Sequence, residues 1–217
     1  RIEGSYIYGI IIKIKVMSEF KKYCEGLNQF YSKRYGITIV EMTSKINFLP
    51  QINKNGTARL HNGIPKYKTS WEINPQYDPA QFPNDGTYGY LFVEDNLKEE
   101  IVNMGETQNA NSRPNNYNCV SFNKDFQPLG QKSNGSTNIG KNILMAAGLK
   151  AGRNYRLILV AFGECVNEFG ERMIAPSQEK TMNQLYTNST GKNKPIWNGE
   201  LKKLVTEYKS IFEYGQK

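Results

Sequence analysis

The residue types that most often carry catalysis are few and scattered in this sequence. His61 is the only histidine, which excludes metal sites built from a pair of histidines. The three cysteines, Cys24, Cys119 and Cys165, form no C-x-x-C pair, and none lies in a glycine-flanked elbow. Cys24 and Cys119 lie on patterns typical of core residues. We therefore expect neither a metal centre nor a cysteine nucleophile.

Two acidic pairs are a second candidate for chemistry. Glu94-Asp95 and Glu99-Glu100 could serve glycoside or two-metal chemistry if burial separated their pKa values. Adjacent acids at a strand end and in the first turn of a helix are more typical of a solvated surface patch. The pairs do not predict a catalytic centre.

A glycine-rich segment is the third candidate. Residues 135–141, Gly-Ser-Thr-Asn-Ile-Gly-Lys, match most of a phosphate-binding loop, whose main-chain N–H groups surround a phosphate at a helix N-terminus. Asn142 stands where Mg²⁺ binding requires Ser or Thr, and no buried strand precedes the segment. A flexible loop is the preferred interpretation, so the sequence predicts no catalytic site and no cofactor.

Basic residues are better placed for binding than these motifs are for catalysis. The chain has 28 Lys and Arg against 20 Asp and Glu, a formal net charge of +8, which favours contact with phosphate. Basic residues outnumber acidic ones 12 to 4 in residues 1–70 and 13 to 7 in residues 131–217, whereas residues 71–130 hold 3 and 9. Paired cations on strand faces predict phosphate contacts, which depend on charge more than on base identity. The predicted nucleic-acid-binding residues are Lys13, Lys15, Lys66, Lys68, Arg153 and Arg156.

The elements that must position these residues follow from hydrophobic periodicity. Residues 6–17 alternate apolar and basic positions, which predicts a strand with one buried face and one basic face. Residues 19–34 repeat apolar side chains at three-to-four spacing, which predicts an amphipathic helix capped by Ser18 and ended by Gly36. Residues 37–49 alternate again before a proline, which predicts one long strand.

The rest of the chain predicts further strands separated by long loops. We expect strands over residues 66–73, 88–93, 117–122 and 155–162, the last of them central and buried on both faces. We expect short helices over residues 96–104 and 142–149, and exposed loops over residues 108–116 and 130–140. Asn198 is the expected N-cap of a C-terminal amphipathic helix. Together these elements favour a mainly β fold, a decorated β-sandwich, over any βαβ fold.

Domain organisation and cellular context are bounded by the same sequence. Residues 1–5, Arg-Ile-Glu-Gly-Ser, resemble a cloning or processing remnant, and residues 6–217 are expected to form one domain. The apolar run at residues 7–17 contains two lysines and is too short to span a bilayer, so no membrane insertion is expected. Three cysteines without a disulfide pattern favour a reduced intracellular setting.

The order of elements in residues 6–50 resembles that of the jelly-roll capsid proteins of small circular single-stranded DNA viruses. The resemblance rests on Tyr31-Ser-Lys-Arg-Tyr35-Gly-Ile37 leading into a strand that ends Phe48-Leu49-Pro50, and on residues 101–105 and 122–128. It implies an antiparallel jelly-roll β-sandwich with the helix at residues 19–34 inserted and a C-terminal helix added. The first, third and last strands of such a roll share the inner sheet, which would gather the six basic residues on one surface. The Arg-rich N-terminal extension of that family is not present in the sequence.

The expected function is therefore that of a non-enzymatic viral capsid subunit. Copies of the chain would assemble into a small icosahedral shell and package single-stranded nucleic acid by nonspecific phosphate contacts. The expected location is the virion, with the host nucleus or cytoplasm during assembly. Two alternatives stay open: a non-catalytic protein that binds single strands on a basic sheet face, and an enzyme built around Asp and Glu.

Overall fold

The computed structural model describes residues 17–34, 36–83, 86–130, 137–163, 165–166, 172–173 and 175–213. The helices are α1 Glu19–Tyr31, α2 Arg113–Asn116, α3 Thr137–Lys150, α4 Glu179–Thr190 and α5 Ile196–Glu213, with a 3₁₀ turn at Pro79–Gln81. The strands are β1 Ile37–Glu41, β2 Thr43–Pro50, β3 Leu60–His61, β4 Ile64–Pro65, β5 Tyr67–Ile73, β6 Tyr88–Glu94, β7 Ile101–Thr107, β8 Tyr155–Phe162, β9 Cys165–Val166 and β10 Arg172–Met173.

A four-stranded antiparallel sheet forms the centre of the molecule, with the order β1-β8-β6-β7. The inner strands β6 and β8 are mostly apolar, and every residue of β6 is buried. Such near-continuous apolar runs are typical of strands covered on both faces. The prediction of a central strand at residues 155–162 is confirmed with the same bounds.

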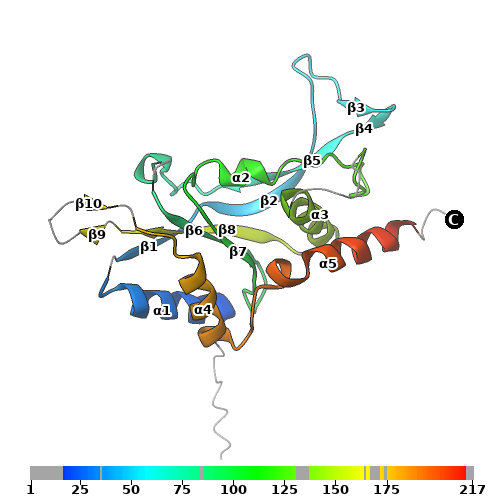
Figure 1. Cartoon of the computed structure of the whole chain (residues 1–217). Coiled ribbons are helices and arrows are strands. Elements are labelled where there is room, and N and C mark those ends of the chain that lie inside the picture. The colour runs from blue at the N-terminus through cyan, green and yellow to red at the C-terminus, as the bar shows by residue number, and fades with distance from the viewer. Residues whose placement is uncertain are drawn as a thin grey trace, which may run out of the picture.

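Each face of this sheet packs against a different layer (Figure 1). On one face α1 and α4 bury Tyr23, Leu27 and Met182 against β6 and β8. On the other face lie the β2–β5 pair, α3 and the start of α5, which contribute Met145 and Trp197 to a second core. The sheet is thus the middle of three layers, with one hydrophobic core on each of its faces.

Helix α1 forms as its sequence predicts. The Ser18 hydroxyl accepts a hydrogen bond from the main-chain N–H of Lys21 at 3.3 Å, which satisfies one of the free donors of the first turn. The apolar stripe faces the sheet, and the helix ends at Tyr31, three residues before the predicted end. Gly36 has a φ of 68°, the left-handed geometry that favours glycine where the chain turns into β1.

The prediction of one strand over residues 37–49 is wrong, because the chain changes sheets at Met42. β1 pairs with β8, whereas β2 pairs with β5 in a separate two-stranded sheet. The Met42 N–H donates to the carbonyl of Leu157, and the Met42 carbonyl accepts from Asn74, so each side of this residue is bonded to a different neighbour. Alternation of apolar residues is the same on both sides of the junction, so periodicity alone cannot reveal it.

Three further predictions are corrected around the β6–β7 hairpin and the segment that follows it. Residues 101–107 form strand β7 instead of the helix expected over residues 96–104, since the Asn96 side chain accepts from Lys98 N–H and starts a tight turn. Residues 117–121 form no strand, and Phe122 makes only isolated bridges, to Tyr67 and Pro128. The segment at residues 108–116, expected as an exposed loop, contains α2.

The C-terminal part differs from its prediction in detail. Helix α4 was not expected at all. Asn198, expected as an N-cap, lies inside α5, and its side-chain amide bonds both the N–H and the carbonyl of Met104 at 2.9 and 2.7 Å. Asn198 therefore takes the place of a neighbouring strand along the free edge of β7.

The antiparallel sheet and the predicted helices near residues 19–34 and at the C-terminus are present, but a jelly roll is not confirmed. The described residues form one four-stranded sheet and three two-stranded ones, whereas a jelly roll packs two large sheets face to face. The strand predicted over residues 6–17 falls almost wholly outside the described residues. Across the part of the chain that the structure describes, none of the helices combines the length and apolarity that crossing a membrane would require.

Candidate functional site

The six basic residues predicted to bind nucleic acid do not gather on one surface as far as the structure describes them. Lys13 and Lys15 lie outside the described residues. Lys66 and Lys68 flank the start of β5, whereas Arg153 and Arg156 lie at and in β8 of the central sheet. The four described residues therefore form two separate pairs and not the common surface that the resemblance implied.

Arg153 and Arg156 also form ion pairs with carboxylates. Arg156 donates to Glu41 at 2.9 Å and to Glu99 at 2.6 Å, and its side chain is only 17% exposed. Arg153 lies 3.5 Å from Glu94. A cation already neutralised by two carboxylates has little free charge for a phosphate. Their role as phosphate ligands stays a prediction, and the ion pairs argue for a structural role.

Replacing Arg156 with glutamine is expected to lower the free energy of unfolding by about 1–2 kcal/mol, because two half-buried carboxylates lose their counter-charge. Hydrogen bonds from Ser18 and Arg156 lower the pKa of Glu99. A carboxyl with a lowered pKa in the folded state stabilises at neutral pH, and that stabilisation is lost as the pH falls through this lowered value. Urea denaturation of the wild type and the variant should therefore differ at pH 7 and converge in acid.

The exposed Lys33→Gln serves as the control for this substitution. Equal stability of the wild type and Arg156→Gln at pH 7 would contradict the structural role. A clear loss of nucleic-acid affinity without a loss of stability would restore Arg156 as a ligand.

Other groups that sequence reasoning considered have structural roles. Burial raises the pKa of the Cys24 thiol to about 12, with the charges of Glu99 and Glu25 adding to the effect, so a thiolate nucleophile is disfavoured. Asn142 accepts from the Val120 N–H at 2.8 Å and donates to the Thr69 hydroxyl at 2.7 Å. It therefore joins α3 to its neighbours and does not face a phosphate loop.

Two open hollows lie on the side of the molecule that carries α1 and α4. One, of about 580 Å³, is lined by Phe30 and Arg34 from α1 and Leu185 from α4. The other, of about 480 Å³, contains Lys192, which Glu19 and Glu100 neutralise at 2.6 and 3.2 Å. Arg34 already stacks on Phe30. Neither hollow therefore combines free charge with buried polar groups.

Free charge and buried polar groups occur together in a cluster of side chains on the opposite face of the sheet. The Arg113 guanidinium lies 4.6 Å from the ring centre of Tyr90, and Lys141 Nζ lies 5.7 Å from the ring centres of both Tyr90 and Tyr117. Asn103 shares this face, because it pairs with Phe92 across the β6–β7 ladder. We name these residues the Tyr90 cluster: Tyr90, Asn103, Arg113, Tyr117 and Lys141.

Four elements hold the cluster in place. Gly105 faces Tyr90 across the ladder, and a Cβ at Gly105 would lie 2.5 Å from the Tyr90 hydroxyl oxygen, so glycine makes room for the phenol. Arg113 begins α2 and donates from its Nη2 to the carbonyl of Glu106 at 2.9 Å. Lys141 lies one turn into α3, on the side buried against the sheet.

Several polar atoms of the cluster have no hydrogen-bond partner among the described residues. They are both amide atoms of Asn103, which is fully buried, and Nε of Arg113; the Tyr117 hydroxyl makes no hydrogen bond of ordinary geometry, although Tyr90 and Arg113 lie close enough to shift its pKa. Neither Arg113 nor Lys141 forms an ion pair with a described carboxylate. Unpaired buried polar groups cost about 1–3 kcal/mol each. Their concentration here makes the Tyr90 cluster the candidate site.

The protonation of the cluster is shifted by its burial. Burial lowers the pKa of the Lys141 ammonium, and the adjacent Tyr90 opposes this effect. Burial raises the pKa of the Tyr117 phenol, and Tyr90 raises it further. Lys141 is thus easier to deprotonate than an exposed lysine, while Tyr117 keeps its proton. Perturbed groups that converge in one place are a common sign of a functional site.

Arg113 bonds to the main chain of Glu106, whose carboxylate bonds to the start of α4. Glu106, half-buried at the end of β7, accepts hydrogen bonds from the main-chain N–H groups of Gln178 and Glu179 at 2.5 and 3.0 Å. It thereby fixes the first turn of α4, whose body packs on the other face of the sheet. The charge of the exposed Glu179 acts on Lys141 and raises its pKa slightly. Arg113 and Glu106 mark the half-buried rim.

Sequence reasoning missed this cluster. It placed residues 135–141 in a loop, whereas α3 begins at Thr137 and turns Lys141 inward. A lysine flanked by a helical run of apolar residues was the one local signal. The chain matches no protein-family model, no curated protein sequence and no solved structure. Function is therefore inferred from the arrangement of the side chains.

Proposed function

We propose that the protein binds nucleic acid and hydrolyses a phosphodiester bond at the Tyr90 cluster. The observation that carries the proposal is the approach of Arg113 and Lys141 to one buried phenol without a carboxylate partner among the described residues. Arg156 and Lys192, in contrast, each contact two carboxylates. A buried cation such as Lys141 needs a counter-charge, and a bound phosphodiester supplies it.

The donor set suits phosphate in particular. A guanidinium offers a planar set of N–H donors that matches two phosphate oxygens, and a lysine ammonium adds a point charge. The Asn103 amide and the Tyr117 hydroxyl add neutral donors nearby. The net charge of +8 favours a polyanion over a small anion. Nucleic acid offers phosphate oxygens to the two cations, acceptors to the neutral donors, and a polyanionic backbone to the net positive charge.

The groups can also carry out the hydrolysis. Water adds to phosphorus, the bond from phosphorus to the leaving oxygen breaks, and one proton passes from water to that oxygen. Arg113 stabilises the negative charge that grows on the phosphate oxygens. Lys141, whose pKa burial lowers, gives up its proton more readily than an exposed lysine and can take part in the proton transfer. Both cations lie close to the Tyr90 ring, 4.6 and 5.7 Å from its centre.

This proposal keeps the nucleic-acid partner expected from the sequence and departs from the expected shell subunit without catalysis. A shell subunit needs no unpaired cations inside its own core. A jelly-roll capsid role would instead predict megadalton particles in size-exclusion chromatography, whereas a nuclease of this kind is expected to elute as a small species.

The test is cleavage of end-labelled DNA and RNA, single-stranded and duplex, with and without Mg²⁺. The wild type and the exposed-site control Lys202→Ala should cut at equal rates. Asn103→Leu should cut about tenfold more slowly while unfolding at no lower urea concentration, because it removes an unpaired buried amide of similar volume. Absence of cleavage by the wild type under every condition would overturn the proposal, as would full activity of Asn103→Leu.

A further inference from the structure

A basic arm protrudes from the end of the β2–β5 pair (Figure 1). It spans residues 51–66 and includes the short hairpin β3–β4. Its turn is Asn62-Gly63, with φ values of 48° and 81°, the geometry of a two-residue hairpin turn. Residues 52–60 and 62–65 are exposed, so most of the arm is open to solvent. We call this segment the arm.

The arm and its base carry positive charge without any negative charge. Between Glu41 and Glu72 the sequence contains no carboxylate. Lys45 pairs with Glu72 at 3.3 Å, which leaves the cations further along the segment. These are Lys54, Arg59, Lys66 and Lys68, and none of them forms an ion pair with a described residue.

Hydrogen bonds and packing hold the arm in a fixed shape at its base. Arg59 N–H donates to Gln51, Lys66 N–H donates to Arg59, and Gln51 N–H donates to Lys66, which joins three extended segments. Below them Phe48 stacks on Tyr67 and Phe126 with ring centres 5.3 and 3.9 Å apart. A rigid arm loses little conformational entropy when it binds.

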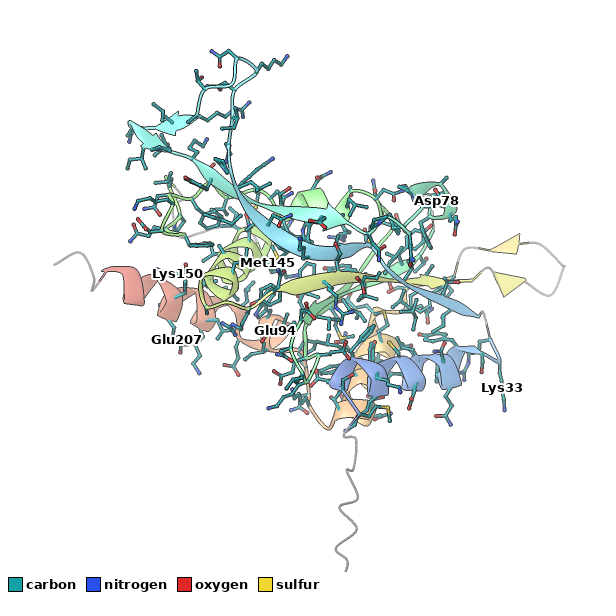
Figure 2. All side chains as sticks on the ribbon, turned by 180° about the vertical axis from the view of Figure 1, so that it is seen from behind. Lys33, Asp78, Glu94, Met145, Lys150 and Glu207 are labelled. Atoms are coloured by element: carbon teal, nitrogen blue, oxygen red, sulfur yellow. The ribbon has the colours of Figure 1, made fainter. Side chains whose placement is uncertain are left out.

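The arm also exposes apolar side chains that a free surface element would normally hide. Ile52, Leu60 and Ile64 are 48%, 58% and 44% exposed. Figure 2 shows the side chains of this segment extending into open space, away from the three-layered body. Apolar side chains beside cations are what contact with base edges, next to phosphates, requires.

We infer that the arm lies in a groove of double-stranded nucleic acid and so makes the substrate a duplex. A two-stranded β-ribbon fits the major groove, where its cations reach phosphates on either side. The arm extends from β5, which contacts both α2 and α3, the helices that carry Arg113 and Lys141. The arm is thus joined through β5 to the two helices that carry the cations of the Tyr90 cluster. The inference rests on the proposed function in taking nucleic acid as the partner.

The experiment measures binding and cleavage separately. Fluorescence anisotropy compares a 20-base-pair DNA duplex with its single strand across a range of salt concentrations. The arm variant is Lys54→Gln, Arg59→Gln and Lys66→Gln together. The charge-matched control replaces the exposed Lys98, Lys194 and Lys202 with glutamine.

The arm variant should bind the duplex at least tenfold more weakly than the control does, with single-strand binding changed less. The slope of log affinity against log salt should fall by about 2–3, since each phosphate contact contributes ~0.9. Equal effects of the arm variant and the control would overturn the inference, and so would equal losses for duplex and single strand. If the wild type cleaves DNA and the arm variant binds normally, only the inference about the arm fails. If the wild type binds no nucleic acid at all, the proposed function fails too.

Discussion

Replacing Arg113 with alanine is expected to slow phosphodiester cleavage by about 10²–10³-fold. The Arg113 guanidinium stacks on Tyr90, and one of its nitrogens donates to the carbonyl of Glu106. Its Nε has no partner among the described residues, so donors remain for a phosphate. The loss should fall on kcat, because charge on the phosphate oxygens grows in the transition state. Arg113→Lys keeps the charge and loses the planar set of N–H donors, so it should recover only part of the rate.

Arg34 provides a matched control for this substitution. It also lies over an aromatic ring, 3.8 Å from the centre of Phe30, and it also donates to a main-chain carbonyl, that of Phe30 at 2.8 Å. Arg34→Ala removes the same kinds of contact on the opposite side of the sheet, and it should leave cleavage unchanged. Equal rates for Arg113→Ala and Arg34→Ala, measured on one labelled duplex, would show that Arg113 takes no part in the reaction.

Replacing Lys141 with methionine should abolish cleavage and at the same time stabilise the protein by about 1 kcal/mol at pH 7. Lys141 is 6% exposed, and its burial lowers its pKa. The folded protein therefore holds this proton less tightly than the unfolded chain does, and unfolding takes up a proton. The stability of the wild type should rise with pH until the unfolded lysine titrates near pH ~10.4.

Urea denaturation at several pH values checks this sign. The advantage of Lys141→Met should be largest near the lowered pKa and below it, and should shrink as the pH approaches ~10.4. The exposed Lys194→Met is the control and should change neither stability nor cleavage. The contrary result is a Lys141→Met protein that is less stable than the wild type by the same free energy of unfolding at every pH. It would mean that Lys141 is a core residue without an unpaired charge. Such opposite effects on stability and activity are typical of functional sites.

Local sequence patterns predicted the parts of the fold that depend on neighbours in the chain. Ser18 caps α1 as expected, and the apolar run of β8 is central and buried as expected. The strand at residues 37–49 was predicted as one element because alternation continues through Met42. Its change of sheet depends on hydrogen bonds to Leu157 and Asn74, which are distant in sequence. A pattern of period two carries no information about such partners.

The candidate site could not be predicted for the same reason. Tyr90 reads as an ordinary strand residue, and Arg113 lies in a polar segment that favours a loop. Only the packing of α2 and α3 against the sheet brings the two cations to one phenol. Conversely, Arg156 looked free in the sequence, and its two carboxylate partners come from distant positions. Unpaired charge is a property of the folded arrangement and not of spacing along the chain.

The most direct test of the central claim is an NMR titration of lysine side chains labelled at Cε with dimethyl phosphate, a small stable phosphodiester. Its neutral counterpart, trimethyl phosphate, is the control ligand, and the signal of Lys141 is identified by its absence in Lys141→Met. We expect dimethyl phosphate to shift this signal and to raise the pKa of Lys141 toward the ordinary lysine value, with no effect of trimethyl phosphate. An unchanged Lys141 signal, or equal shifts with both compounds, would contradict a phosphodiester site at the Tyr90 cluster.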